Sequence, residues 1–256
     1  MNENLAVQLI DIRKSYGSQE VLKGVNLSIK EGKTTVIVGG SGQGKSQIIK
    51  HILGLIRPNS GQVMVYGKDL NNVNNKQLKE IRNDFGVLFQ NAALFDSMTV
   101  FDNVALPLRE RTKVPEKEID KIVNEKLVMM DVEGTNDKYP AQLSGGMRKR
   151  VGLARALVLN PKIVFFDEPT TGLDIAKSNE IYRVFFKTQT ALGYTAVIVS
   201  HDVPRIFKLA DYVALLHNGV VQGCLTPEEF QLSDNPVIKA FVETTMGPLY
   251  SSEMEV

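Results

Sequence analysis

The sequence predicts an α/β fold organised around a glycine-rich loop, with an antiparallel β subdomain and an inserted α-helical subdomain. Residues 35–38 are an apolar run, and a glycine-rich loop and the segment 47–53 follow in the order strand, loop, helix. Between residues 100 and 130, apolar side chains recur at three- and four-residue steps, the spacing of a helix face. Residues 163–166 form another buried-strand pattern, directly followed by two acidic residues.

The first 90 residues alternate between strand patterns and turns. Residues 13–17 are polar with one aromatic side chain, so we expect a turn there between two strands. Residues 71–83 are polar and rich in amides, which predicts a short surface helix. The strands expected in this part of the chain are residues 6–12, 21–29, 35–38, 62–66 and 84–89.

Helices dominate the middle of the chain. We expect Pro107 and Pro115 to separate the helices of the 100–130 region, because proline interrupts the helical hydrogen-bond ladder. Asn218 and Gly219 are a strong hairpin signal near the end of the chain. The other elements expected downstream are helices at 148–160, 179–192 and 236–243, and strands at 163–166, 196–200, 212–216 and 220–223.

The domain organisation predicted from these patterns is a single domain over residues 1–246. Residues 1–90 and 155–246 would form the core, and residues from about 91 to 154 the helical lobe. The polar segment 247–256 is expected to be a flexible tail.

Composition narrows the classes of partner. The 256 residues contain 30 Lys and Arg against 29 Asp and Glu, a net charge of +1, so nothing indicates nucleic acid as a partner. The single Cys224 leaves no internal disulfide and suits a reducing compartment. The N-terminus has no signal-peptide pattern, and apolar runs are shorter than the roughly 18 residues of a membrane span. We therefore expect a chain that reaches a membrane only through a partner.

The glycine-rich loop carries the pattern G-x-x-x-x-G-K-S. Its glycines allow successive N–H groups to face a phosphate chain, and the following helix directs its positive end at the same anion. Lys45 would reach the β- and γ-phosphates, and the Ser46 hydroxyl would bind magnesium. The alternative is an ordinary glycine-rich turn. The nucleotide-binding residues predicted in the loop are Gly39, Ser41, Gly42, Gly44, Lys45 and Ser46.

A second motif, Leu143-Ser144-Gly145-Gly146-Met147, lies downstream of this loop and upstream of the acidic strand end. With the phosphate loop, it resembles the signature of ATP-binding subunits of ATP-binding-cassette (ABC) transporters, which have a P-loop NTPase core. The resemblance covers residues from about 6 to 230. It implies a head-to-tail homodimer, in which Ser144, Gly145 and Gly146 face the γ-phosphate bound by the other copy. Alone, the motif would be a helix N-cap after a flexible turn. Met147 replaces the usual Gln.

The resemblance assigns roles to further residues. Asp167 and Gln90 would join Ser46 around Mg²⁺, and Glu168 would polarise the water that attacks the γ-phosphate of ATP. Each residue also has a plain alternative, such as a solvated acidic pair or an ordinary surface histidine. The remaining assignments are His201 as the switch histidine, Tyr16 as the aromatic that stacks on adenine, Gln47 in place of the usual Thr near the α-phosphate, and residues 172–174 as the D-loop. Lys45, Gln90, Glu168 and His201 are the predicted catalytic set.

The sequence indicates the transported substrate less directly than it indicates ATP hydrolysis. The sequence of residues 85–95 and 103–110, together with Met147, resembles that of the ATPases of phospholipid transporters (Mla/Mce type), which maintain outer-membrane lipid asymmetry. This implies a permease that docks near residues 90–100, an Mce-type lipid-binding protein, and a location at the cytoplasmic face of the inner membrane. An importer of amino acids or other polar solutes is the main alternative. A DNA-repair ATPase would need a long heptad insertion in the lobe, and a translation-type factor would ordinarily carry two cassettes.

A small regulatory partner of the tail is a further expectation, suggested by Phe241, Leu249 and Tyr250 in polar surroundings.

Overall fold

The computed structural model describes residues 4–247, so most of the predicted tail, with Leu249 and Tyr250, lies outside the described residues. Contacts divide the chain into two compact units, and each is described by itself. Unit 1 comprises Met1–Val73 and Val199–Val256, and unit 2 comprises Asn74–Ile198.

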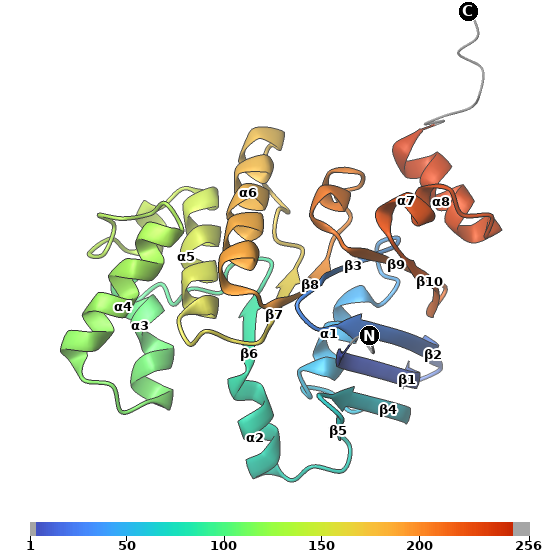
Figure 1. Cartoon of the computed structure of the whole chain (residues 1–256), viewed down its shortest axis with the longest axis horizontal. Helices are drawn as coiled ribbons and strands as arrows, with labels where there is room; N and C mark the ends of the chain where they lie inside the picture. The colour runs from blue at the N-terminus through green and yellow to red at the C-terminus, as the bar shows by residue number, and fades with distance from the viewer. Residues whose placement is uncertain (1–3, 248–256) are drawn as a thin grey trace, which may run out of the picture. The chain divides into compact units, whose positions relative to one another are not determined.

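Unit 1 contains an antiparallel sheet with the strand order β2-β1-β4-β5 (Figure 1). The predicted turn at residues 13–17 is wrong, because β1 continues to Tyr16, which pairs with Gln19. Register shifts along β1 let the polar residues keep pairing with β2, and the turn falls at Gly17, whose φ is +59°. The strands of this sheet are β1 (Leu5–Tyr16), β2 (Gln19–Lys30), β4 (Ser60–Val65) and β5 (Lys68–Asp69).

The rest of unit 1 surrounds a fully buried strand, β3 (Thr34–Val38), which pairs in parallel with β9 (Tyr212–His217). The predicted hairpin at Asn218 and Gly219 is confirmed, since β9 pairs antiparallel with β10 (Val220–Leu225). The helices of unit 1 are α1 (Lys45–Ile52), the 3₁₀ helix η2 (Arg205–Leu209), α7 (Pro227–Gln231), which the sequence reading missed, and α8 (Pro236–Met246).

Unit 2 contains strands in the order β8-β7-β6: β8 (Thr195–Val199), β7 (Ile163–Asp167) and β6 (Phe85–Leu88). β6 and β7 run parallel, with Leu88 opposite Phe166. Both strands therefore end at the same edge, where polar residues follow each of them. The helices of unit 2 are α2 (Asn75–Asn83), α3 (Val100–Arg111), α4 (Glu116–Met129), the 3₁₀ helix η1 (Pro140–Gln142), α5 (Gly145–Leu157) and α6 (Ile175–Leu192).

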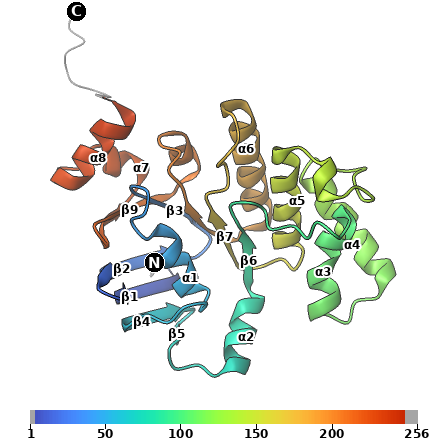
Figure 2. The same cartoon turned by 180° about the vertical axis from the view of Figure 1, so that it is seen from behind.

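The lobe predicted from the helical pattern is seen in both views, where α3, α4 and α5 lie together (Figures 1 and 2). The sequence suggested that Pro107 separates two helices. This prediction is wrong, because Pro107 lies inside α3. Proline in a helix interior costs about 3 kcal/mol. Val104 and Leu108 on either side are buried at 0% and 3% exposure, and their burial offsets that cost. α6 also starts earlier than predicted, because Asp174 caps its first turn by accepting from Lys177 N.

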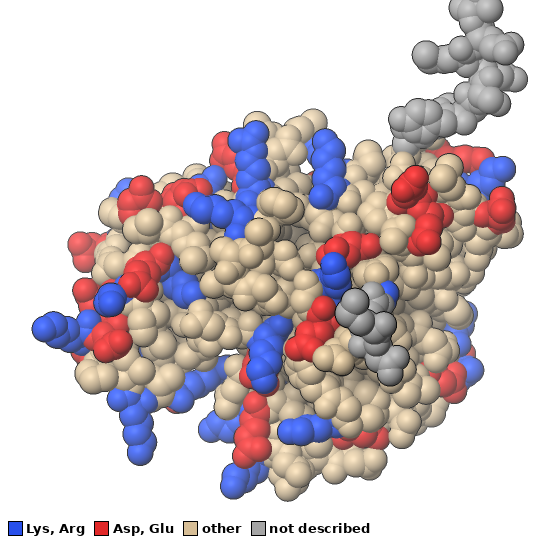
Figure 3. Space-filling view, viewed as in Figure 1, with Lys and Arg blue, Asp and Glu red and all other residues tan. Residues whose placement is uncertain are grey.

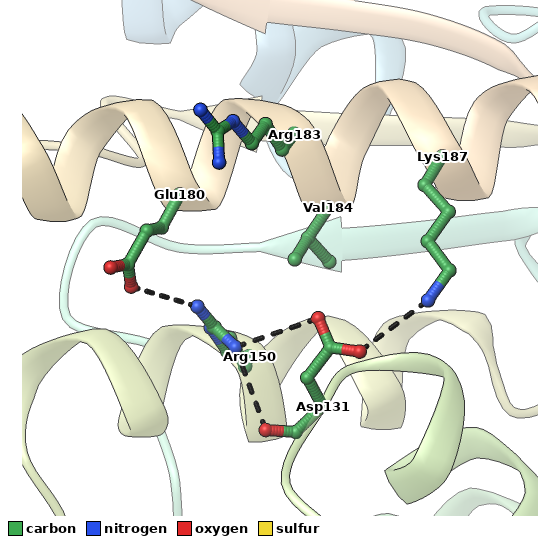
Figure 4. A pocket seen from close by; sticks show the side chains of 6 residues that line it. All are labelled: Asp131, Arg150, Glu180, Arg183, Val184 and Lys187. Carbon is green, nitrogen blue, oxygen red and sulfur yellow. Dashed lines mark hydrogen bonds and ion pairs between the residues drawn. The ribbon is translucent and has the colours of Figure 1, made fainter.

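Ion pairs connect α5, α6 and Asp131, which follows α4 (Figure 4). Arg150 on α5 pairs with Glu180 on α6 at 2.9 Å and with Asp131 at 3.7 Å. Asp131 also pairs with Lys187 at 3.4 Å. These charged side chains line a pocket of ≈ 160 Å³. Because they pair with one another, we interpret the cluster as a structural contact between helices.

The surface carries charges of both signs, and Lys, Arg, Asp and Glu are interspersed on the face shown in Figure 3. Within residues 4–247, every helix is too short or too polar to cross a bilayer.

His51 gives unit 1 a pH dependence. It lies in α1 at 1% exposure, and its Nδ1 donates to the Gln47 carbonyl at 2.7 Å. Nε2 is buried and has no hydrogen-bond partner among the described residues, so adding a proton there would bury a charge. Burial therefore lowers the pKa of His51 below its ordinary value of 6.5, more than the Gln47 hydrogen bond raises it, and Lys14 lowers it further.

We predict that the free energy of unfolding falls as the pH drops below 6.5, the ordinary value that His51 regains on unfolding, because the unfolded state then binds a proton that the folded state does not. The slope from this residue is at most about 1.4 kcal/mol per pH unit. Urea unfolding at several pH values, for the parent and His51→Phe, measures it. An equal acid slope in both proteins would contradict the prediction.

Candidate functional site

The glycine-rich loop of unit 1 joins β3 to α1 and depends on its glycines. Gly39 has φ +151°, and a Cβ there would lie 2.2 Å from the Leu216 carbonyl oxygen. Gly44 caps α1 with φ +97°, and a Cβ there would lie 2.9 Å from a methyl group of Val21. Gly42, at φ +75°, has open space beside it. The loop is therefore packed at both ends and open in the middle, which leaves its main chain accessible to a ligand.

Lys45 is the first residue of α1, and it is only 7% exposed. Its ammonium group donates to the carbonyls of Gly39 and Gly40, at 2.9 Å each. These two bonds hold the ammonium group at the glycine-rich loop, where a phosphate bound by the loop would lie within its reach. Ser46 follows on the same helix turn. The geometry thus fits the predicted triphosphate, and we propose Ser46 as a ligand of its Mg²⁺.

Tyr16 and Gln47 meet beside this loop. The Tyr16 hydroxyl donates to Gln47 Oε1 at 2.9 Å, and the Lys14 ammonium lies 5.3 Å from the Tyr16 ring centroid. Tyr16 is 45% exposed, so its ring is available to a flat ligand. The structure therefore brings both predicted residues together, and Gln47 has a partner that the sequence did not reveal.

Gln43, in the loop, was not among the predicted site residues. Its Oε1 accepts from the main-chain N–H of Asn218 at 2.7 Å, which ties the loop to the β9–β10 turn. The turn signal at Asn218 was visible in the sequence, but its proximity to residue 43 arises from the parallel pairing of β3 and β9.

His201, also in unit 1, follows the strand end at Val199. The neighbouring Ser200 N–H donates to the Ile37 carbonyl at 3.2 Å, just before the glycine-rich loop. This bond places residue 201 next to the base of the loop, while its side chain is exposed.

In unit 2, Gln90 and Glu168 lie two positions beyond the paired residues Leu88 and Phe166. Because β6 and β7 are parallel, both residues emerge at one edge of the sheet. Asp167 is the last residue of β7. Glu168 has φ +51°, an uncommon left-handed conformation for a non-glycine residue, and such a conformation costs on the order of 1–3 kcal/mol. Its carboxylate accepts from Thr171 Oγ1 at 3.0 Å.

The predicted signature forms the start of α5. The helix begins at Gly145 instead of Arg148, because Ser144 is its N-cap and accepts from Met147 N at 3.2 Å. Ser144 is exposed, and a Cβ on Gly146 would meet nothing within 4 Å. The helix N-terminus is therefore open, as a site for an anion requires.

Lys149 was missed by sequence reasoning. It lies on α5, is 6% exposed, and its ammonium group donates to the main-chain carbonyl of Gln90. Burial lowers the pKa of Lys149 to about 8, and the charge of Glu168 acts in the opposite direction. Only the fold could reveal this contact, since residues 90 and 149 are far apart in the chain.

Each unit therefore collects part of the predicted set. Unit 1 carries Tyr16, the loop from Gly39 to Gln47, and His201; unit 2 carries Gln90, the signature from Ser144 to Gly146, Asp167 and Glu168.

Comparison with known proteins adds the family. A sequence profile of the ABC transporter family matches residues 22–171, more than half of the chain. The probable ribonucleotide transport ATP-binding protein mkl of Mycobacterium leprae is 40% identical over 99% of this chain and 73% of its own length. The intermembrane phospholipid transport system ATP-binding protein MlaF of Haemophilus influenzae is 37% identical over 97% of this chain and 94% of its own. The methionine import ATP-binding protein MetN of Carboxydothermus hydrogenoformans is 40% identical over 87% and 66%.

Solved structures agree on the fold. The protein cbiO1 of Clostridium perfringens, part of the ABC transporter complex cbiONQ, superimposes with a TM-score of 0.83 at 31% identity, over 96% of this chain and 98% of that one. The cassette MJ0796, a dimer bound to ADP and Pi after hydrolysis, gives a TM-score of 0.78 at 34% identity, over 86% and 98%. The profile match and these relatives show that the chain belongs to the ABC transporter family and is an ATP-hydrolysing subunit of such a transporter.

Proposed function

We propose that this ATPase drives phospholipid transport between bacterial membranes. The observation that carries the proposal is the similarity to MlaF, which extends over 94% of that protein, whereas MetN is matched over 66% of its length. The MlaF comparison therefore covers nearly the whole of a relative named for phospholipid transport. The Met147 signature and the residues after Gln90 support the same branch.

The chemistry that we propose is ATP hydrolysis assisted by Mg²⁺. Lys45 and the N–H groups of the glycine-rich loop bind the phosphates, and Tyr16 stacks on adenine. Ser46, Gln90 and Asp167 are the proposed Mg²⁺ ligands, and the ion supplies charge neutralisation on the phosphates. Glu168 acts as the base that orients the attacking water, with His201 at the γ-phosphate.

A homodimer completes the proposed mechanism. The open N-terminus of α5, with Ser144, Gly145 and Gly146, would face the phosphates bound by a second copy. The dimeric cassette MJ0796 is a solved precedent among the structural neighbours.

The proposed permease contact is the segment after Gln90. Phe95 is 50% exposed, while its main chain is fixed: its N–H donates to Asn103 Oδ1 at 2.8 Å, and its carbonyl accepts from Asn103 Nδ2 at 3.1 Å. Of the two apolar residues that could have been lobe core, Leu94 is half-buried and Phe95 projects outward. A fixed, exposed aromatic residue suits docking by a membrane subunit. Through it the chain would sit at the cytoplasmic face of the inner membrane, in a complex with an Mce-type lipid-binding protein and a small regulatory subunit.

A solute importer is the second candidate, favoured by the 40% identity to MetN. Both candidates require the same ATPase, so the test must identify the cargo.

We expect the chain, purified with its native membrane complex, to retain phospholipid together with a membrane-anchored lipid-binding protein. Mass spectrometry of extracted lipids and of the protein partners measures this, with a complex carrying Lys45→Ala as a control for nucleotide dependence. A lipid-free complex containing a solute-binding protein would reject the phospholipid proposal and leave the ATPase assignments unchanged.

Glu168→Gln should keep ATP binding and lower kcat about a hundredfold or more, because the amide cannot take up the proton of water. Gln has the same length, so the Thr171 contact and the main-chain conformation can persist. Steady-state hydrolysis and ATP-dependent dimer formation by sedimentation measure both effects. Glu125→Gln, on the exposed pair with Lys121, is the matched control. Hydrolysis by Glu168→Gln at the parental rate would remove Glu168 as the base.

Tyr16→Ala should weaken ATP binding roughly five- to a hundredfold, the range expected when an aromatic platform worth ~1–3 kcal/mol is lost. Tyr16→Phe keeps the ring and loses only the hydroxyl bond to Gln47, so its affinity should remain within about threefold of the parent. Titration with a fluorescent ATP analogue gives both dissociation constants. Equal losses in the two variants would show that the hydroxyl, and not the ring, matters.

A further inference from the structure

We propose that Lys149 is a positioning residue for ATP hydrolysis, whose ammonium group fixes the main chain at Gln90 and the carboxylate of Glu168 relative to each other. The inference rests on the proposed role of Glu168 as the base. Helix α5, which begins at the signature, would then have two roles. Its N-terminus would contact a second copy of the chain, and Lys149 would act within its own copy.

The first argument is the way α5 packs on the loop after β6. Lys149, Gly152 and Arg155 recur every three residues and so share one face of the helix. Lys149 donates to the Gln90 carbonyl, and Arg155 Nη2 donates to the Ala92 carbonyl at 2.8 Å.

Gly152, between these two cations, permits the close approach. A Cβ there would lie 2.9 Å from Leu88 Cδ1 and 3.0 Å from Ala92 Cβ. The loop is held at this distance although Ala92 and Ala93 have φ of +59° and +47°, which are unfavourable for alanine. The buried Lys149 and the half-buried Arg155, each donating to a carbonyl oxygen, stabilise this strained main chain.

The second argument is the charge near Lys149. Burial of an ammonium group with a carbonyl as its acceptor is costly, and the negative charge of Glu168 acts favourably on it. Glu168 in turn accepts from Thr171 Oγ1 at 3.0 Å. Lys149 and Thr171 line the same pocket, so the ammonium group that holds the Gln90 main chain and the hydroxyl that holds the Glu168 carboxylate face one space.

The third argument is that Lys149 borders an open pocket. Lys149 lines a pocket of ≈ 330 Å³ in unit 2, together with Gln90, Asn91, Gly145 and Thr171. The pocket extends from the start of the signature helix to the residues that follow β6 and β7. A lysine that served only to fill the core would not be expected to line a pocket. A methionine would fill the same space without the cost of a buried charge, so the charge itself points to a role at the pocket.

The test compares three variants of the full chain in its transporter complex. Lys149→Met removes the charge at similar length, Lys149→Gln keeps an N–H donor without charge, and Lys149→Arg keeps both. We expect kcat to fall about tenfold or more in the Met variant, less in the Gln variant, and to recover toward the parent in the Arg variant. KM for ATP should change by less than about threefold, since Lys149 lies outside the phosphate loop. Lys121→Met, on an exposed pair with Glu125, is the matched control.

Thermal melting separates positioning from folding. The Met variant should melt within a few degrees of the parent, because relief of the buried charge offsets the lost hydrogen bond to the Gln90 carbonyl. A parental kcat in Lys149→Met would overturn the proposal, and so would a loss of kcat matched by a lower Tm that Lys149→Arg fails to rescue.

The double variant with Glu168→Gln distinguishes this inference from the proposed role of Glu168. If Lys149 acts through Glu168, adding Lys149→Met to Glu168→Gln should lower kcat by less than about twofold more. Fully additive losses would show that Lys149 acts independently and reject the inference while Glu168 stays the base. A parental kcat in Glu168→Gln alone would instead reject the role of Glu168.

Discussion

The contact between α5 and the main chain that follows β6 is the constraint on which the rest of unit 2 depends. Lys149 and Arg155 donate to the Gln90 and Ala92 carbonyls, and Gly152 leaves room for the loop between them. The same helix starts at the signature and pairs with α6 through Arg150 and Glu180. The N-terminus of α5 and the end of β6 therefore cannot shift independently without breaking the hydrogen bonds of Lys149 and Arg155. The lobe therefore keeps a fixed relation to the edge where Glu168 lies.

Main-chain conformation is the second common feature of the site. Glu168, Ala92 and Ala93 adopt positive φ without being glycine, and the glycine-rich loop requires it at Gly39 and Gly44. Such conformations persist where neighbouring contacts hold them, as Thr171 holds Glu168 and Arg155 holds Ala92. In unit 2 the main chain at Glu168 and Ala92 is therefore fixed by contacts within the protein itself, which suits a reaction that depends on positioning and charge.

Much of this was predictable from sequence. Strand, loop and helix around Lys45, the acidic end of β7 and the hairpin at Asn218 carry local signals, and the structure confirms those elements. The errors have local causes too: register shifts extend β1 through a polar stretch, and flanking buried residues keep Pro107 inside α3. Lys149 and Gln43 could not be found, because each contacts a main-chain group distant in sequence, and no side-chain pattern encodes a main-chain partner.

Asn103 has a consequence for how the surface around Phe95 can vary among related chains. Its side chain is fully buried and contacts the main chain of residues 95, 98 and 99 at once. The Asn103 amide bonds three carbonyls and one N–H at the same time, and this is possible only at the present length of the segment. An inserted or deleted residue would therefore leave several of these groups unpaired. The exposed side chain of Phe95 can therefore be replaced without disturbing these bonds, whereas the number of residues between 95 and 103 cannot change without breaking them.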